Sequence, residues 1–439
     1  MSRLALLGGK PLCALPPPKV RFPSFSKKAV SAVVERIESR KQVELGGHPL
    51  LESRIREYHG GGHALALSSG TATLQIAMAA LGVGPGDEVI TSPYSWGATT
   101  ACILQLGAIP VFTDVERETG LMNPEDIQRL ITRRTKAVMV VHIYGQAANM
   151  TRISAVARKH NLLVIEDGSQ SHGALWKGRK VGRFGDSAGF SCMGGKLLAG
   201  TEGGYALFKR RRDYFAALTL SQHPKRSSEP GLPPDYKGYW DSLFYSYRIC
   251  LLSADLLAEQ VLKLDREIET RRQNVAILRK MLSGSQYFSF PRYGKGCEPS
   301  YHMVTANFDW EKAGVRTDTF RNAVTAEGFQ VFGYVPSPIP TWKRMNWQGY
   351  DGPPAPWLRW LKQAKANYRD LRFPQCEWKI AHEVEFGFNY LAVEPRRMQA
   401  FADCLLKVEE NLSALREWER QKVQPRTSAA SPVCRVNRY

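Results

Sequence analysis

Residues 137–167 read AVMVVHIYGQAANMTRISAVARKHNLLVIED, two apolar runs separated by a segment of helix length. The runs at Ala137–Val141 and Leu162–Ile165 contain no polar residue, which is typical of parallel strands buried on both faces. The stretch Met150–His160 between them has the length of a crossover helix. A strand, a helix and a second strand in this order predict one unit of a doubly wound α/β sheet.

The same alternation extends outward from this unit, from about residue 63 to residue 208. Short apolar runs are separated by helix-length segments such as Thr71–Leu81. We therefore expect a large α/β domain with a mostly parallel central sheet and helices on both faces. The predicted strands are Ala64–Leu67, Glu88–Ile90, Ile109–Thr113, Ala137–Val141, Leu162–Ile165, Ala188–Ser191 and Gly204–Phe208.

The chain of 439 residues is too long for one small core and suits a large domain with a smaller companion. The predicted units are an N-terminal arm at 1–30, the large domain at 31–250, one long connecting helix at 251–284, a small α+β domain at 285–415 and a disordered basic tail at 416–439. Local patterns add helices over 28–41 and Glu52–Tyr58, and a polar, Pro-rich surface loop over 221–240.

Composition limits the classes of function. The net charge is +19, but the basic residues are spread along the chain and accompany no nucleic-acid-binding motif, so we expect no specific nucleic-acid partner. The eight cysteines form no C-x-x-C pair and lie near no histidine at zinc-finger spacing, so no metal site is expected. No apolar run is long enough to span a membrane, and the N-terminus lacks a secretory pattern, so a cytoplasmic location is expected.

Several candidate ligand-binding residues fall where predicted strands end, the edge at which open α/β sheets bind ligands. Ser68-Ser69-Gly70-Thr71-Ala72 follows a strand and opens a helix, so its free N–H groups and hydroxyls form either a phosphate seat or an ordinary helix cap. Asp167 ends the apolar strand LLVIE, and its carboxylate suits a metal, a ribose, a protonated ring nitrogen or plain solvent.

Lys196 stands among apolar and small residues in Cys192-Met193-Gly194-Gly195-Lys196-Leu197-Leu198. A lysine is costly to bury without a partner, and in such surroundings its pKa falls and its amine can form a Schiff base. The alternative is a lysine whose amine extends to the surface. Trp96, in Pro93-Tyr94-Ser95-Trp96, either stacks on a planar ring or packs in the core or a loop.

In this order and spacing the segments resemble the DegT/DnrJ/StrS family of sugar aminotransferases, which adopt the fold-type-I architecture of pyridoxal-phosphate (PLP) enzymes. The resemblance runs from about Leu4 to Leu412. It is carried by LALLGGKPL, ALSSGTATLQIAMAALGVGPGDEVITSPYSW, GAIPVFTDV, HIYGQAANM, VIEDGSQSHGA, GFSCMGGKLLAGTEGG and YSYRICLLSADLLAEQ.

The resemblance implies a role for each matched residue. Lys196 aligns with the lysine that forms the Schiff base with PLP and shuttles the proton, and Asp167 with the carboxylate that pairs with the pyridine nitrogen. Trp96 aligns with the aromatic residue that stacks on the ring, and Gln170 with the residue beside its O3′. The phosphate seat is expected at Gly70, Thr71, Ala72 and Ser191.

Three segments depart from the family pattern. The family usually has Asn-Tyr-Arg where this chain has Ser246-Tyr247-Arg248. In the family this segment reaches the phosphate bound by the partner subunit, and the resemblance therefore implies a homodimer with shared active sites. Tyr334-Val335-Pro336-Ser337-Pro338 lacks the family's Pro-Leu-His, and Phe386-Gly387-Phe388-Asn389 replaces a more polar, His-containing segment. Both departures concern recognition of the acceptor.

The start and end of the chain look most like the branch of scyllo-inosose aminotransferases and 3-amino-5-hydroxybenzoate synthase. The expected activity is transfer of an amino group from an amino acid, glutamine or glutamate, to a keto-sugar or keto-cyclitol, in secondary-metabolite or sugar biosynthesis. The alternatives are a PLP-dependent lyase or dehydratase on the same fold and a non-catalytic PLP-binding regulatory protein. Dehydrating relatives carry His in place of the lysine, and Lys196 favours transamination.

Overall fold

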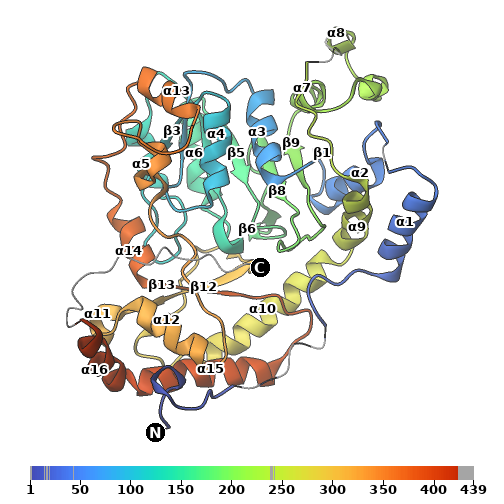
Figure 1. The fold of residues 1–439 in the computed structure, drawn as a ribbon. Coiled ribbons are helices and arrows are strands. Elements are labelled where there is room, and N and C mark those ends of the chain that lie inside the picture. The colour runs from blue at the N-terminus through green and yellow to red at the C-terminus, as the bar shows by residue number, and fades with distance from the viewer. Residues whose placement is uncertain are drawn as a thin grey trace.

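The structure of the protein is a computed structural model, which describes residues 2–13, 15, 18, 20–42, 44–237, 241 and 243–423. A large α/β domain carries the central sheet, and a smaller domain of helices and short strands lies against one edge of it (Figure 1). The helix α10 (Leu264–Met281) runs from the large domain into the small one.

The central sheet has seven strands in the order β1-β9-β8-β5-β4-β2-β3. β2, β3, β4, β5 and β8 are mutually parallel, whereas β9 runs antiparallel to both of its neighbours. This confirms the predicted mostly parallel sheet. The strands are β1 (His63–Leu67), β2 (Glu88–Thr91), β3 (Ile109–Phe112), β4 (Thr135–Val141), β5 (Leu163–Asp167), β8 (Ser187–Ser191) and β9 (Gly204–Phe208).

Both faces of this sheet are buried, as the apolar runs indicate. Along β4, Ala137 and Met139 face a core built with α3, α4 and α7, while Val138 and Val140 face the opposite core. The helices of the large domain are α1 (Lys27–Glu38), α2 (Pro49–Tyr58), α3 (Gly70–Ala80), α4 (Gly97–Gln105), α5 (Pro124–Leu130), α6 (Met150–Lys159), α7 (Arg211–Ser221), α8 (Pro234–Lys237) and α9 (Leu251–Val261). Short strands β6 (Leu175–Trp176), β7 (Arg179–Lys180) and β11 (Cys297–Glu298) form a separate three-stranded sheet.

The small domain is built on a three-stranded antiparallel sheet, β10-β12-β13. One face of this sheet packs on helices through Val304, Ala306, Phe308, Val384 and Phe386. Its elements are β10 (Phe288–Ser289), α11 (Trp310–Ala313), α12 (Thr317–Ala326), β12 (Met303–Phe308), β13 (Glu383–Gly387), α15 (Pro395–Glu410) and α16 (Leu412–Val423).

The predicted single helix at 251–284 is wrong, because the chain forms two helices, α9 and α10, with a break at Leu262 and Lys263. The buried positions 257, 261, 264 and 268 keep helical spacing across the break. The helical spacing of the buried residues therefore continues through a point at which the helical backbone is interrupted. Neither Gly nor Pro stands at the break to mark it.

The predictions for both ends of the chain also need correction. Residues 416–423 of the predicted disordered tail continue α16, whose Leu412 and Leu415 are buried in the small-domain core. Residues 424–439 lie outside the described residues. In the predicted arm, Leu4 is fully buried in that same core, and the backbone N–H groups of Ala5 and Leu12 donate to Glu327.

Two further segments pack differently from the prediction. The loop at 221–240 holds a 3-10 helix (Pro224–Ser228), and its Arg226 is buried and paired with both carboxylate oxygens of Glu52 at 3.0 and 2.9 Å. Within the predicted small domain, the chain from Val335 to Cys376, including α13 (Trp357–Gln363) and leading into α14 (Pro374–His382), returns to the core of the large domain.

Candidate active site

The sequence-predicted site residues meet at one edge of the central sheet. Asp167 and Ser191 are the last residues of the parallel strands β5 and β8. Ser191 pairs with Gly204 of β9, and Gly204 pairs on its other side with Leu67, the last residue of β1. Because β1 and β8 run in the same direction, their carboxyl ends bring the segment after Leu67 beside Ser191.

The start of α3 forms an anion seat at this edge. Ser69 caps the helix, and its Oγ accepts a hydrogen bond from the Ala72 N–H at 3.2 Å. A Cβ placed on Gly70 would lie 2.5 Å from the Cβ of Ser191, so only glycine allows this approach. The N–H groups of the first turn, with Thr71 and Ser191 beside them, suit a phosphate group.

The Asp167 carboxylate is held from two sides. Its Oδ2 accepts a hydrogen bond from Thr99 Oγ1 at 2.7 Å, and its Oδ1 accepts one from the Ser169 N–H at 3.1 Å. Thr99, on α4, is in turn 2.8 Å from Ser95 Oγ. Asp167 is buried, so its orientation is fixed and solvent is largely excluded from it.

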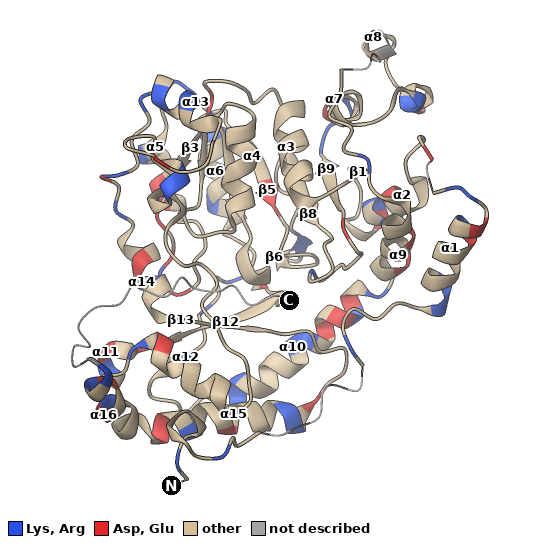
Figure 2. Cartoon of the chain, viewed as in Figure 1, with Lys and Arg blue, Asp and Glu red and all other residues tan. Residues whose placement is uncertain are grey.

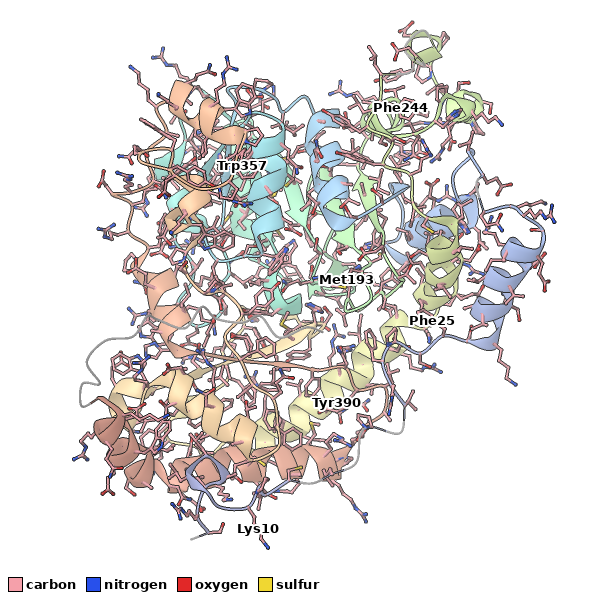
Figure 3. The ribbon with its side chains drawn as sticks, in the orientation of Figure 1. Lys10, Phe25, Met193, Phe244, Trp357 and Tyr390 are labelled. Atoms are coloured by element: carbon pink, nitrogen blue, oxygen red, sulfur yellow. The ribbon has the colours of Figure 1, made fainter. Side chains whose placement is uncertain are left out.

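Lys196 lies in the turn that follows β8. Its backbone N–H donates to the Met193 carbonyl at 2.8 Å, and the Gly200 N–H donates to the Cys192 carbonyl at 2.8 Å, which folds the loop back on itself. Met193 marks this loop between the sheet and the small domain in Figure 3. Burial lowers the pKa of the Lys196 amine, and the negative charge of Asp167 partly opposes that shift. A lowered pKa favours the neutral, nucleophilic amine.

Gln170 is fixed between two tyrosines. Its Oε1 accepts a hydrogen bond from the Tyr144 N–H at 2.8 Å, and its Nε2 donates to the Tyr334 hydroxyl at 2.9 Å. Tyr144 has φ 61° and ψ 7°, a left-handed conformation that costs a bulky residue roughly 1–3 kcal/mol. Strained residues of this kind gather at functional sites.

Trp96 is not a core residue. Its side chain is 60% exposed, and its ring centre lies 6.1 Å from that of Tyr334. An exposed indole at the ligand-binding edge of the sheet is available to stack on a planar ring.

Ser246 lies in a segment that runs next to the anion seat. The Tyr247 carbonyl accepts a hydrogen bond from the Ser68 N–H at 2.9 Å, and Arg248 bridges to Leu67. Ser246 itself is exposed, with φ 43°. Asparagine adopts this left-handed conformation more readily than serine does.

Residue-by-residue reasoning missed two histidines around Lys196. His172 and His302 are buried, and neither nitrogen of His172 nor Nδ1 of His302 has a hydrogen-bond partner among the described residues. Burial, reinforced by the nearby Lys196 charge, holds the pKa of both imidazoles well below the usual value. His172 lies within the motif VIEDGSQSHGA, so its place in this motif could have identified it as a site residue.

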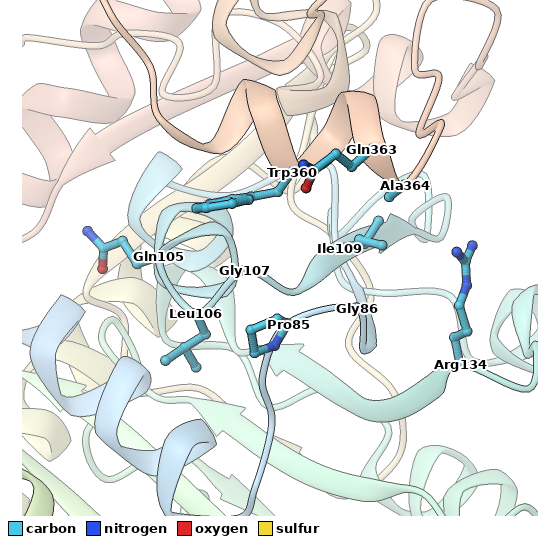
Figure 4. A pocket seen from close by; sticks show the side chains of 10 residues that line it. All are labelled: Pro85, Gly86, Gln105, Leu106, Gly107, Ile109, Arg134, Trp360, Gln363 and Ala364. Atoms are coloured by element: carbon cyan, nitrogen blue, oxygen red, sulfur yellow. The ribbon is translucent and has the colours of Figure 1, made fainter.

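The structure also has a cavity of about 390 Å³ that is separate from this site (Figure 4). It is lined by residues that precede strands, among them Gly86, Gly107 and Arg134, and by Trp360 of α13. It therefore lies at the amino ends of β2, β3 and β4, the edge opposite Asp167. Arg134 is already paired with Glu88 at 2.6 Å.

Among the described residues, no helix is long and apolar enough to cross a membrane. In the same part of the chain, no three His, Cys, Asp or Glu side chains gather as metal ligands.

Comparison with known proteins gives concordant matches. The model of the DegT/DnrJ/EryC1/StrS aminotransferase family matches residues 25–350. The L-glutamine:2-deoxy-scyllo-inosose aminotransferase of Streptomyces kanamyceticus is 34% identical over 352 residues, which cover 75% of this chain and 80% of the relative. The enzyme of the same name from Streptomyces lividus is 35% identical over 296 residues, 65% of this chain and 69% of the relative.

A solved structure shows the same fold. The X-ray structure of the aminotransferase from Psychrobacter cryohalolentis superposes with a TM-score of 0.77 at 24% identity. The match covers 90% of this chain and 100% of that one.

Proposed function

The chain belongs to the DegT/DnrJ/EryC1/StrS aminotransferase family, and we propose from this that it binds pyridoxal phosphate through Lys196. It is an aminotransferase, as the sequence predicted. One arrangement supports the assignment of the cofactor: the half-buried Lys196, the Asp167 carboxylate held by Thr99, and the anion seat at Gly70 and Ser191 occupy one sheet edge.

The residues of the site fit this cofactor. Gly70 and Ser191 are in close contact, which brings the first turn of α3 to the end of β8. The N–H groups of this turn, which includes Thr71 and Ala72, can then bind a phosphate. The exposed indole of Trp96 offers a face for the pyridine ring. When bound, the cofactor supplies an electron sink for negative charge at the amino-bearing carbon.

Each protein group then has a definite task. Lys196 Nζ would hold the cofactor and, as a free amine, would carry the proton. Asp167, kept in place by Thr99, would pair with a protonated ring nitrogen and so maintain the electron sink. Gln170 would face the O3′ side of the ring, and Ser246 of one subunit is assigned to the phosphate bound by the other.

We assign the donor as glutamine or glutamate and the acceptor as a keto-cyclitol or related keto-sugar. The support is the name of the relatives, which use L-glutamine and 2-deoxy-scyllo-inosose. The protein is further proposed to be a cytoplasmic homodimer. If light scattering showed that the active protein is a monomer, the shared active site would be contradicted.

A half-reaction tests the cofactor and the donor. The purified protein is loaded with pyridoxal phosphate, and its visible absorption is followed as glutamine, glutamate or alanine is added. The expected result is loss of the visible band with a productive donor. Lys196→Ala should lack that band, whereas Lys209→Ala, a change at an exposed lysine, should keep it. A normal band in Lys196→Ala would refute the assignment.

A further inference from the structure

The small-domain sheet has a polar face that is as deeply buried as its apolar one. Glu383 and Glu385 alternate with Val384 and Phe386 along β13, so the two carboxyls point to the side opposite the apolar core. Both glutamates are buried, at 2% and 0% exposure. This face is directed at the large domain, since Tyr94, which precedes α4, contacts Glu383.

Among the described residues, these two carboxyls face only one deeply buried cation, so burial opposes the ionisation of both. The buried Lys379 amine of α14 lies 3.6 Å from Glu385 Oε1 and hydrogen-bonds Thr305 and Asn307 at 2.7 and 2.8 Å. Arg321 of α12 donates to the backbone carbonyl of Glu383, not to its carboxyl.

The two buried carboxyls face the buried amine of Lys379, whose own pKa is lowered by burial, and the half-buried guanidinium of Arg321, whose charge lowers the pKa of both. The other titratable groups facing them are the hydroxyls of Tyr94 and Tyr144 and the thiol of Cys376. Burial and the second carboxyl raise the pKa of Glu383 well above its usual value, and burial raises that of Glu385 less because Lys379 opposes it. The larger upward shift of the pKa of Glu383 favours a proton on Glu383 over one on Glu385.

Glu383 is connected to the candidate active site by an unbroken series of contacts. The Tyr94 hydroxyl donates to Glu383 Oε2 at 2.5 Å, and it lies 2.7 Å from the Tyr144 hydroxyl. Since the Tyr94 proton is used toward Glu383, the Tyr144 hydroxyl is the donor to Tyr94. Tyr144 then holds Gln170 through its backbone N–H and packs edge-on against Tyr334, with ring centres 5.7 Å apart.

We propose that Glu383 is a positioning residue of the active site. It fixes Tyr94, which fixes the left-handed Tyr144, and Tyr144 holds Gln170 and Tyr334 in place beside the cofactor ring. Glu385 and Lys379 form the ion pair that leaves Glu383 uncharged. The proposal rests on the proposed function, because Gln170 is assigned there to the O3′ side of the cofactor.

Three variants separate this role from general stability. Tyr94→Phe removes one hydroxyl, Glu383→Leu removes the acceptor, and Glu383→Gln keeps a neutral acceptor of the same shape. In the loaded enzyme, Tyr94→Phe and Glu383→Leu should shift the pH titration of the visible band and lower kcat about threefold to tenfold, the loss of one hydrogen bond. Glu383→Gln should behave as the wild type. If all three match the wild type, or if Glu383→Gln behaves as Glu383→Leu, the proposal is wrong.

Two measurements on the cofactor-free protein are independent of the proposed function. Infrared spectroscopy should show the carbonyl stretch of a protonated carboxyl at neutral pH, lost in Glu383→Gln. A crystal structure of Tyr94→Phe should show Gln170 displaced from the Tyr144 N–H. A missing infrared band, or Gln170 unmoved, would overturn the proposal, whereas a wild-type protein that fails to take up pyridoxal phosphate would refute the proposed function alone.

Discussion

At the scale of single residues, the buried imidazole of His59 links the stability of the fold to pH. Its Nε2 lies 3.0 Å from the Tyr205 hydroxyl, and burial lowers its pKa from 6.5 to about 3. Below pH 6.5 the unfolded chain takes up a proton that the folded protein does not. The contribution of His59 to stability is therefore lost as the pH falls, by about 1.4 kcal/mol per pH unit.

His59→Gln tests this dependence. At pH 7.5 the variant should be less stable than the wild type, because the packing of the ring against Phe190 is lost. The difference should narrow by about 1.4 kcal/mol for each pH unit below 6.5, since glutamine does not titrate. Urea unfolding at several pH values measures the difference in free energy of unfolding between the two proteins. A difference that does not change with pH would contradict a neutral buried histidine.

The same substitution should cost much more stability at Glu385 than at Glu383. Glu385→Gln leaves the buried Lys379 ammonium without its counter-charge and should cost about 3–5 kcal/mol. Glu383→Gln replaces a neutral group and should cost less than about 1.5 kcal/mol. Guanidinium unfolding of the two variants makes the comparison, and equal losses would show that the proton is not held on Glu383.

The pH dependence of the Glu383→Gln variant has a defined sign. Because the folded pKa of Glu383 is raised above 4.5, the stability it contributes is present at low pH and is lost as the pH rises. The variant should therefore gain on the wild type between pH 5 and pH 8. A gain in the opposite direction would mean that Glu383 is ionised in the fold.

Ser246 offers a test of backbone strain. Its φ of 43° disfavours a residue with a Cβ, and asparagine tolerates the left-handed region better than serine. Ser246→Asn should raise stability by up to about 1 kcal/mol, measured by thermal unfolding. Ser289→Asn, on the exposed end of strand β10, is the control and should give no gain.

At the scale of secondary-structure elements, the junction of β8 with α3 determines the anion seat. Gly70→Ala would place a Cβ 2.5 Å from that of Ser191 and so force the two elements apart, at a cost of about 1–3 kcal/mol. The affinity for pyridoxal phosphate should fall about tenfold to a hundredfold. Gly84→Ala meets no atom within 4 Å and should bind as the wild type. Equal affinities measured by fluorescence titration would place the phosphate elsewhere.

The elements also show what a sequence can and cannot reveal. The strands were predictable because each is a short, largely apolar run that a polar residue ends, as Asp167 ends β5, or follows, as Ser68 follows β1. The break between α9 and α10 was not, because burial alone does not record backbone geometry. Gly70, Asp167 and Ser191 fall at one edge of the sheet, but Thr99 and Glu383 contact their partners only through tertiary packing and carry no local pattern.

At the scale of the whole molecule, the charge of +19 is distributed rather than concentrated. Figure 2 shows Lys and Arg on α1, α10, α13, α15 and α16, interspersed with Asp and Glu. Such a surface gives weak, nonspecific attraction to polyanions. Retention on immobilised DNA should be slight at low salt and vanish as salt is raised, without dependence on DNA sequence. Sequence-dependent retention at physiological salt would contradict this expectation.

The two domains exchange pieces of chain, and this determines when each can be completed during synthesis. All seven strands of the large sheet have been made by residue 208, but Leu361, Tyr368, Phe373 and Cys376 finish the core beneath them. Conversely, Leu4 is made before the whole large domain, yet the core that buries it closes only with Leu412 and Leu415. Although domains generally fold as units from the N-terminus, the first of these two cores cannot close before Cys376 has been made, and the second cannot close before Leu415.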